Sequence, residues 1–351
     1  MRERSYSHRP GLRTRDPVGG TSSLEYFLLT FDVEEWFQVE NFKTRIPFSS
    51  WASRESRVER STHLILDFLD QMGSAYSEDK RPNGPLRATF FVLGWVAERM
   101  PSLVRQIRSR GHEVASHGYK HDLCARISTA ELTKDIRESK ELLEDILGTA
   151  VLGYRAPSFS ITEKAIEILQ ECGYLYDSSF NSFGANSRYG KIQISPNGMG
   201  ITYRTRGNIY ELPISNFRAG RYIIPAGGGA YFRLMPVRLF AKMVHSVLRN
   251  QNAYLFYLHP WETDPGQPKV KDVPPFLRFR HYTNISMTLS KLSYLIGRLR
   301  ELSFISCGDY IRRMLDFSKP AHPMEAAFER LSLIKASIPA SKGSSISLNS
   351  E

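Results

Sequence analysis

The chain has 351 residues, long enough for one large α/β domain or two small ones, and its 41% of hydrophobic and 24% of charged residues are typical of a soluble globular protein. No apolar run approaches the roughly 18 residues that a membrane-spanning helix needs, so we expect no transmembrane segment. The net charge of +11 is scattered and accompanies no DNA- or RNA-binding motif, so we expect a solvated basic surface and no nucleic-acid partner.

Composition divides the chain into a central domain and two tails. Residues 1–23 are rich in Arg, Gly, Ser and Pro and predict a disordered basic tail, and residues 318–351 predict a flexible one. The sequence between them, 24–317, predicts a single domain with a helical C-terminal extension from about residue 266.

Features that the sequence lacks predict where the protein works. The N-terminal arginines have no apolar stretch behind them, so they do not form a secretory signal. Cys124, Cys172 and Cys307 form no close pair, which favours reduced thiols in a cytoplasmic protein. The basic tail and the segment Lys269–Arg280 favour a weak peripheral association with the inner membrane surface. No pattern indicates an oligomeric state.

Short apolar runs alternate with amphipathic helical patterns along the chain. Runs rich in β-branched or aromatic residues predict strands at Tyr26–Phe31, Ala88–Val92, Val151–Tyr154, Tyr210–Ile214 and Ala253–Leu258. Helices that begin with Pro or a capping Ser or Thr are predicted from Pro101 to Gly111, Ser128 to Gly148, Thr162 to Gly173 and Pro236 to Leu248. This alternation predicts parallel strands joined by helices, which either close into a barrel or form an open sheet.

Acidic residues follow the first predicted strand. Parallel α/β folds bind ligands at the carboxyl ends of their strands, and here the sequence reads Asp32-Val33-Glu34-Glu35. Like charges so close together raise one another's pKa. A bound cation or a catalytic role would offset that cost, and a solvated strand end is the alternative.

Residues suited to metal binding and proton transfer follow later strand ends. His117 and His121 are four residues apart, so they could bind one metal ion from the same face of a helical turn. Arg155 could orient a carboxylate with its guanidinium group. His259 follows the last predicted strand and could act as a general acid or base. Each residue alone has an ordinary structural explanation, and their occurrence together favours a functional site.

The segments around these residues resemble the polysaccharide deacetylase family, also called the NodB-homology or carbohydrate esterase family 4 group. The matching segments are TFDVEEW (30–36), ATFFVLGWVAERMPSLVRQIRSRGHEVASHGYKH (88–121), GYRAPSFSIT (153–162), YDSS (176–179) and YLHPWE (257–262). The DVE-type first motif, a GGG stretch (227–229) and the HPWETDP ending are similar to a subgroup linked to exopolysaccharide biosynthesis.

The resemblance implies a distorted parallel (β/α) barrel, typically of seven strands, that holds one divalent ion, Zn²⁺ or a similar metal such as Co²⁺. It implies His117 and His121 as metal ligands. Asp32 would be the general base that activates the attacking water, and Arg155 would hold Asp32 in place. His259 would be the acid that protonates the departing amine.

The first motif departs from the family's pattern. Many members have adjacent aspartates there, the second of which binds the metal, whereas this chain has Val33 at that position. Because alternate residues of a strand face the same side, Glu34 accompanies Asp32 and is expected to be the third ligand. Glu35 is the alternative.

A second departure concerns the residue that orients His259. The acidic-Trp motif expected between Arg155 and His259 has no clear counterpart in this chain. Asp177 and Glu211 are the candidates for that role or for a packing role.

The implied activity is removal of N-linked acetyl groups from an amino-sugar-containing polysaccharide or a lipid-linked glycan intermediate. An amide or amidine hydrolase of the allantoin- or urate-pathway type on the same barrel is one alternative, and a non-catalytic glycan-binding relative is another. Trp36, Tyr231 and Trp261, with the GGG stretch, could place flat apolar faces and backbone against a sugar ring, or could serve only in packing.

Overall fold

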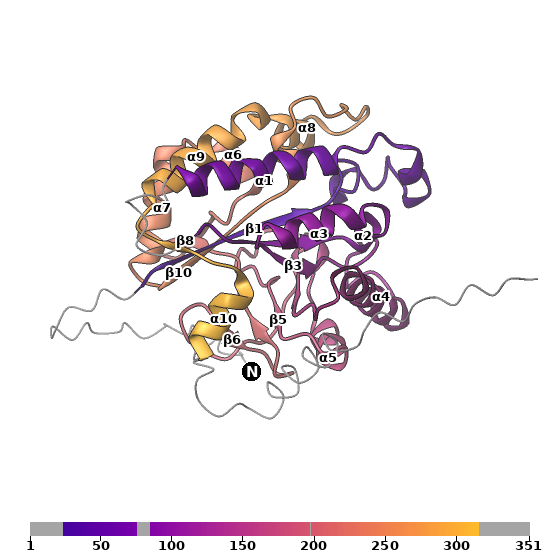
Figure 1. Cartoon of the computed structure of the whole chain (residues 1–351), viewed down its shortest axis with the longest axis horizontal. Helices are drawn as coiled ribbons and strands as arrows, with labels where there is room; N and C mark the ends of the chain where they lie inside the picture. Colours follow the sequence, from indigo (N-terminus) through magenta and orange to yellow (C-terminus); the bar gives the residue numbers. More distant parts are fainter. Residues whose placement is uncertain (1–23, 76–84, 197, 316–351) are drawn as a thin grey trace, which may run out of the picture.

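The computed structural model describes residues 24–75, 85–196 and 198–315. The predicted tails, 1–23 and 318–351, lie outside the described residues. Helices surround a curled sheet in which the strands run through the middle of the molecule (Figure 1). Within the described ranges, no helix has both the length and the apolar character that crossing a bilayer requires.

Seven parallel strands follow one another across the sheet in the described part of the chain, as the barrel prediction requires. In spatial order they are β10 (Ala253–Leu258), β1 (Tyr26–Val33), β2 (Ala88–Val92), β3 (Glu113–Ser116), β4 (Gly153–Tyr154), β5 (Tyr176–Asp177) and β7 (Tyr210–Glu211). Two short strands complete the sheet: β6 (Tyr203–Arg204) extends this path by pairing antiparallel with β7, and β11 (Ser303–Phe304) lies off the path and pairs parallel with β1.

The gap between β7 and β10 is closed by irregular backbone rather than by a ladder. The hairpin of β8 (Asn216–Ala219) and β9 (Tyr222–Pro225) lies in this connection, and after it Gly227 O accepts a 2.8 Å hydrogen bond from Tyr257 N. Gly228 has φ 132°, and a Cβ there would lie 1.9 Å from Tyr257 O, so only glycine fits. The GGG stretch therefore completes the barrel wall, which explains why the barrel is distorted.

Two predicted strands are shorter than expected. The runs at 151–154 and 210–214 pair over only two residues each, as β4 and β7. Their shared neighbour β5 is itself only two residues long before the chain turns away, so the ladders cannot extend. The strands predicted at 26–31, 88–92 and 253–258 are confirmed.

Helices with clear end signals form where the sequence predicts them. They are α3 (Pro101–Ser109), α4 (Thr129–Leu147), α5 (Glu163–Glu171) and α7 (Val237–Leu248). Ser128 and Glu131 form the predicted capping box of α4, and Gly148 ends that helix with φ 65°. The remaining helices were not predicted individually: α1 (Val58–Ser74), α2 (Gly94–Arg99), α6 (Gly229–Leu234), α8 (Pro275–Tyr282), α9 (Thr288–Arg298) and α10 (Cys307–Leu315).

Alternation along the strands separates two apolar clusters. On β1, Tyr26 and Leu28 belong to a cluster inside the barrel, whereas Phe27, Leu29 and Phe31 pack outward under the helices. Helix α10 adds its own apolar side chains to the inner cluster and contacts β1. It thereby covers the amino end of the barrel, so that a ligand site can form only at the carboxyl end.

Candidate active site

In four strands, the alternate residues that point into the barrel lead to the side chains that the sequence analysis identified as candidate site residues. On β1 the row of Tyr26 and Leu28 continues to Asp32, and on β10 the row of Leu255 and Tyr257 continues to His259. The same alternation directs His117, after β3, and Arg155, after β4, toward the carboxyl mouth of the barrel. The period of two therefore brings together residues that are far apart in the sequence.

Glu34, His117 and His121 form the one cluster of potential metal ligands found in the described ranges, with one ligand atom from each lying within 4.8 Å of the others. All three side chains are buried. His121 Nε2 lies 2.8 Å from Glu34 Oε2. The pKa of Glu34 falls to about 2: burial raises it, but His121, His259 and His117 together lower it further. Burial lowers the pKa of His117 to about 4.

The two histidines do not lie on a helical turn, so the expected reason for their convergence is wrong. They belong to an irregular loop after β3 in which Gly118 has φ 72° and His121 has φ 56°. Asp135 on α4 fixes this loop, because its carboxylate oxygens accept hydrogen bonds from Tyr119 N at 2.9 Å and Lys120 N at 3.0 Å. A Cβ at Gly118 would lie 2.6 Å from that carboxylate, which explains the glycine.

Neighbouring groups orient the three potential ligands. His117 Nδ1 donates to Arg155 O at 2.8 Å, which leaves Nε2 free for a metal ion. Trp261 Nε1 donates to Glu34 Oε1 at 3.1 Å. Among the described residues, the buried atom His121 Nδ1 has no hydrogen-bond partner, and Glu34 Oε2 has only its 2.8 Å contact with His121 Nε2. Two buried imidazoles and a carboxylate, with one nitrogen unsatisfied, fit a divalent ion such as Zn²⁺.

Asp32 is held by a buried arginine. Arg155 Nη1 donates to Asp32 Oδ1 at 2.6 Å and to Thr30 Oγ1 at 2.8 Å. The same guanidinium is fixed from the other side by Ser178, whose backbone and side-chain oxygens each accept at 2.9 Å, and it lies 4.0 Å from the centre of the Phe91 ring. One carboxylate oxygen of Asp32 therefore faces Arg155, and Oδ2 faces His259 at 3.8 Å.

His259 points Nε2 toward the two acids of the first motif. Nε2 lies 3.8 Å from Asp32 Oδ2 and 3.7 Å from Glu34 Oε1. Nδ1 donates to Glu262 Oε1 at 2.8 Å. Burial lowers the pKa of His259, but the hydrogen bond to Glu262 and the charges of the three carboxylates outweigh burial and raise it to about 9.

Glu262 is the orienting residue that the sequence analysis missed. It lies three residues after His259, in the turn Pro260–Thr263. Its Oε2 accepts from Arg233 Nε at 2.6 Å, and both of these side chains are fully buried. Burial raises the pKa of Glu262, but Arg233 and His259 lower it to about 2. The glutamate stands in the quoted HPWE motif, so its spacing from His259 was the available signal.

Asp177 and Glu211, the expected candidates for this role, do not contact His259. They face each other across β5 and β7, and both are fully buried. Burial and the repulsion between the two acids raise the pKa of Glu211 well above its usual value. Asp177 Oδ1 accepts from Ser179 Oγ at 2.6 Å, and Ser179 Oγ in turn accepts from Ala156 N at 2.7 Å. The pair therefore supports the loop that follows Arg155.

Glu35 points away from the ligand cluster, as the alternation predicts. Its Oε1 accepts hydrogen bonds from Ser56 Oγ at 2.5 Å and from the backbone N–H groups of Arg57 at 2.9 Å and Val58 at 3.2 Å. These are the groups at the beginning of α1. Glu35 therefore supports a helix start and is not available as the third ligand.

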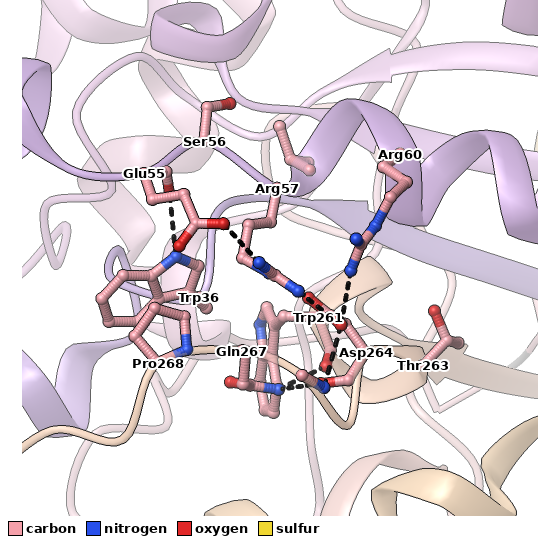
Figure 2. Close-up of polar contacts among 12 residues, drawn as sticks. Trp36, Glu55, Ser56, Arg57, Arg60, Trp261, Thr263, Asp264, Gln267 and Pro268 are labelled. Carbon is pink, nitrogen blue, oxygen red and sulfur yellow. Dashed lines mark hydrogen bonds and ion pairs between the residues drawn. The ribbon is translucent and has the colours of Figure 1, made fainter.

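The turn that carries Glu262 is anchored on α1 (Figure 2). Asp264 accepts from Arg57 Nε at 2.5 Å and from Arg60 Nη2 at 2.9 Å. Gln267 Nε2 donates to Trp261 O at 2.7 Å on the other side of the turn. Trp36 Nε1 donates to Glu55 O at 3.0 Å in the same region. These contacts fix the segment that positions His259.

A pocket of about 440 Å³ opens onto these residues. It is lined by the ligand cluster, Asp32 and His259, and by aromatic side chains of Phe159, Tyr231 and Trp261. Tyr231 is thus available to a bound sugar, as the sequence suggests, whereas the buried Trp261 ring stacks on His259 and on His281 and serves packing. Trp36 does not line this pocket, so its aromatic face serves packing.

Comparison with known proteins assigns the two halves of the chain separately. Residues 84–176 match the polysaccharide deacetylase model, and residues 178–312 match a domain of unknown function, DUF3473. Residues 84–176 are therefore similar to the polysaccharide deacetylase family.

Curated proteins similar to this chain include deacetylases and a deacetylase-like protein. A peptidoglycan-N-acetylglucosamine deacetylase of Bacillus cereus is 31% identical over 160 residues, which are 44% of this chain and 58% of that protein. A peptidoglycan deacetylase-like protein of Gibberella zeae is 29% identical over 125 residues, 36% of this chain and 34% of that protein. The chain therefore spans less than two thirds of the length of either relative.

The fold also has a solved counterpart. A Mycobacterium smegmatis protein assigned as a polysaccharide deacetylase has a crystal structure that matches with a TM-score of 0.52 and 20% identity. The match covers 89% of this chain and 97% of that one. At this identity the similarity establishes the fold, and the (β/α) barrel prediction is confirmed.

Proposed function

We propose that this protein is a metal-dependent hydrolase that removes N-linked acetyl groups from an amino-sugar-containing polysaccharide or its lipid-linked intermediate, in exopolysaccharide biosynthesis. One observation carries the proposal: a buried Glu-His-His cluster, an arginine-held aspartate and a glutamate-held histidine converge on one pocket. Amide hydrolysis needs a polarised carbonyl, a base and an acid, and the pocket offers candidates for all three.

Glu34, His117 and His121 are the residues that would hold the divalent ion. When bound, such an ion would polarise the acetyl carbonyl and lower the pKa of a water molecule. The hydrogen bonds from Trp261 to Glu34 and from His117 to Arg155 O keep two of these side chains oriented before any ion binds.

Asp32 is the proposed base that takes a proton from the attacking water. Arg155 binds Oδ1, so Oδ2 remains free and directed toward the pocket. His259 is the proposed acid that gives a proton to the departing nitrogen. The hydrogen bond from Nδ1 to Glu262 fixes the ring with Nε2 directed toward Asp32 and Glu34.

The relatives support an amino-sugar substrate, since the Bacillus cereus protein is a peptidoglycan-N-acetylglucosamine deacetylase. The DVE-type first motif and the HPWETDP ending support the exopolysaccharide role. Retention of all six site residues, Asp32, Glu34, His117, His121, Arg155 and His259, favours an active enzyme over a non-catalytic glycan-binding relative.

Acetate release from N-acetylglucosamine oligomers tests the proposal, with the protein loaded with Zn²⁺ or Co²⁺ and with Asp32→Asn as the inactive control. We expect release by the wild-type protein and none above background by the variant. Release from allantoin or urate-derived amides, with none from acetylated oligomers, would instead support the amide or amidine hydrolase.

A further inference from the structure

The wall of the active-site pocket contains two arginines that no acid neutralises. Arg188, in the loop after β5, and Arg280, on α8, both line the pocket and are half-buried. Within the described part of the chain, neither guanidinium group lies within 4.0 Å of a carboxylate oxygen. Arg188 Nη2 donates to the neutral Asn41 Oδ1 at 2.6 Å, and the Arg280 guanidinium lies 5.1 Å from the centre of the Tyr231 ring.

The other charges nearby are already paired. Arg233, the third arginine of the pocket, is neutralised by Glu262. Glu40 pairs with Arg126 at 3.3 Å. Lys43 pairs with Asp122 at 2.6 Å. The positive charges of Arg188 and Arg280 therefore remain in excess on this wall.

Holding such charges in a partly buried wall has a cost. Burial lowers the pKa of Arg188, and the nearby Arg280 and Arg126 lower it further against the attraction of Glu40. An anionic ligand between the two guanidinium groups would offset this repulsion. Arginine suits that task because its planar group forms paired hydrogen bonds with carboxylate or phosphate oxygens.

We propose that Arg188 and Arg280 form a subsite for a negatively charged substituent, a carboxylate or a phosphate, on the glycan whose acetyl group the enzyme removes. The proposal rests on the proposed function and specifies its substrate class as an acidic glycan. Tyr189 and Tyr231 line the same wall and supply flat faces for the sugar that carries the charge. Both arginines and both tyrosines belong to the domain of unknown function, 178–312, which gives that domain a role in substrate selection.

Three probes test the subsite with the metal-loaded full chain. The neutral probe is an N-acetylglucosamine tetramer, the carboxylate probe is a tetrasaccharide of alternating glucuronate and N-acetylglucosamine, and the phosphate probe is UDP-N-acetylglucosamine. Calorimetry gives the Kd of each probe, and acetate release gives KM and kcat. We expect at least one anionic probe to bind about tenfold more tightly than the neutral one, and the tighter probe identifies the anion.

Charge-removing variants separate the subsite from general surface charge. Arg188→Gln and Arg280→Gln should each weaken binding of the preferred anionic probe about tenfold, raise its KM and leave kcat and neutral-probe binding nearly unchanged. Arg278→Gln is the matched control, because Arg278 is exposed on the same helix and does not line the pocket. It should leave the affinity for all three probes unchanged.

Equal affinity of the wild-type protein for all three probes would overturn the subsite, as would an equal loss in the Arg278→Gln and Arg280→Gln variants. The failure of the deacetylase proposal is distinguishable. If no probe releases acetate while the anionic preference persists and depends on Arg188 and Arg280, the subsite stands and the deacetylase proposal falls. Acetate release from the neutral tetramer without any preference for the anionic probes would support the deacetylase proposal and overturn the subsite.

Discussion

The two halves of the chain contribute different parts of one site. Residues up to about 177 supply the ligand cluster and Asp32 with its arginine, from the end of β1 and from the segments that follow β3 and β4. Residues 178–312 supply His259, Glu262 and Arg233, together with much of the pocket wall. Neither half holds a complete site, and the matching polysaccharide deacetylase model, which spans residues 84–176, covers His117, His121 and Arg155 but not Asp32, Glu34 or His259.

The difference between the halves is also one of architecture. Both halves present catalytic groups at strand ends: Asp32 at the end of β1, His117 after β3 and His259 after β10. The second half additionally places Glu262 in a turn and Arg233 in a short helix. Rigid strands suit groups that must converge within a few ångströms. Loops and short helices suit recognition, because their sequence can change without disturbing the barrel.

Removing a metal ligand from the first half should have the largest effect. We expect His121→Asn to abolish metal retention and turnover, because it removes one of three ligands while asparagine tolerates the left-handed backbone at this position, φ 56°. Metal content after dialysis, acetate release and circular dichroism measure the result. His245→Asn, at an exposed site on α7, is the control. A folded His121 variant that keeps one equivalent of metal would contradict the ligand assignment.

Removing the proposed base should be nearly as damaging but should spare the metal. Asp32→Asn keeps the shape of the side chain and should lower kcat about 10²–10⁴-fold, the usual contribution of general-base catalysis, with unchanged metal content. Kinetics on the acetylated tetramer and metal analysis on the same sample test this. A loss below tenfold would exclude Asp32 as the base.

Changing the second half at Glu262 should have an intermediate effect that depends on pH. Glu262→Gln removes a negative charge that helps to raise the pKa of His259 to about 9, so that pKa should fall. His259 would then lose its proton at lower pH, and the alkaline limb of the kcat profile should move to lower pH. We expect a loss of about tenfold to hundredfold at neutral pH, less than for removal of a catalytic group. An alkaline limb that stays in place would show that Glu262 acts only in packing; Glu55→Gln, on the surface, is the control.

How far the sequence predicts this molecule differs between its local and its long-range features. Period-two alternation from Tyr26 to Asp32 predicts both the inner row of β1 and the choice of Glu34 over Glu35. Capping at Ser128 likewise predicts α4. These are local signals, which depend on residues a few positions apart.

The features that the sequence did not predict depend on long-range contacts. The convergence of His117 and His121 requires a loop that Asp135 fixes from another helix, and no helical spacing describes it. Arg233 meets Glu262 across 29 residues of sequence, and nothing near either residue signals the pair. The location in the cell and the identity of the metal stay predictions.

The smallest expected effect is on stability, and it concerns the ion pair that connects the two halves of the chain. Asp264, which follows the turn of Glu262, binds Arg57 just before α1 and is almost fully buried. Asp264→Asn keeps the shape but loses a charge-assisted pair, so the free energy of unfolding in urea should fall by about 1–3 kcal/mol. Glu55→Gln breaks an exposed ion pair with the same arginine and should cost under about 1 kcal/mol.

The contribution of Asp264 to stability should also depend on pH. Burial raises the pKa of Asp264, but Arg57 and Arg60 lower it further. The stabilisation is therefore present above about pH 4 and is lost as the pH falls through the lowered pKa. If the two variants lose equal stability at pH 7, or if the difference between Asp264→Asn and the wild-type protein does not shrink in acid, then the turn that positions His259 is not anchored to the first half through this aspartate.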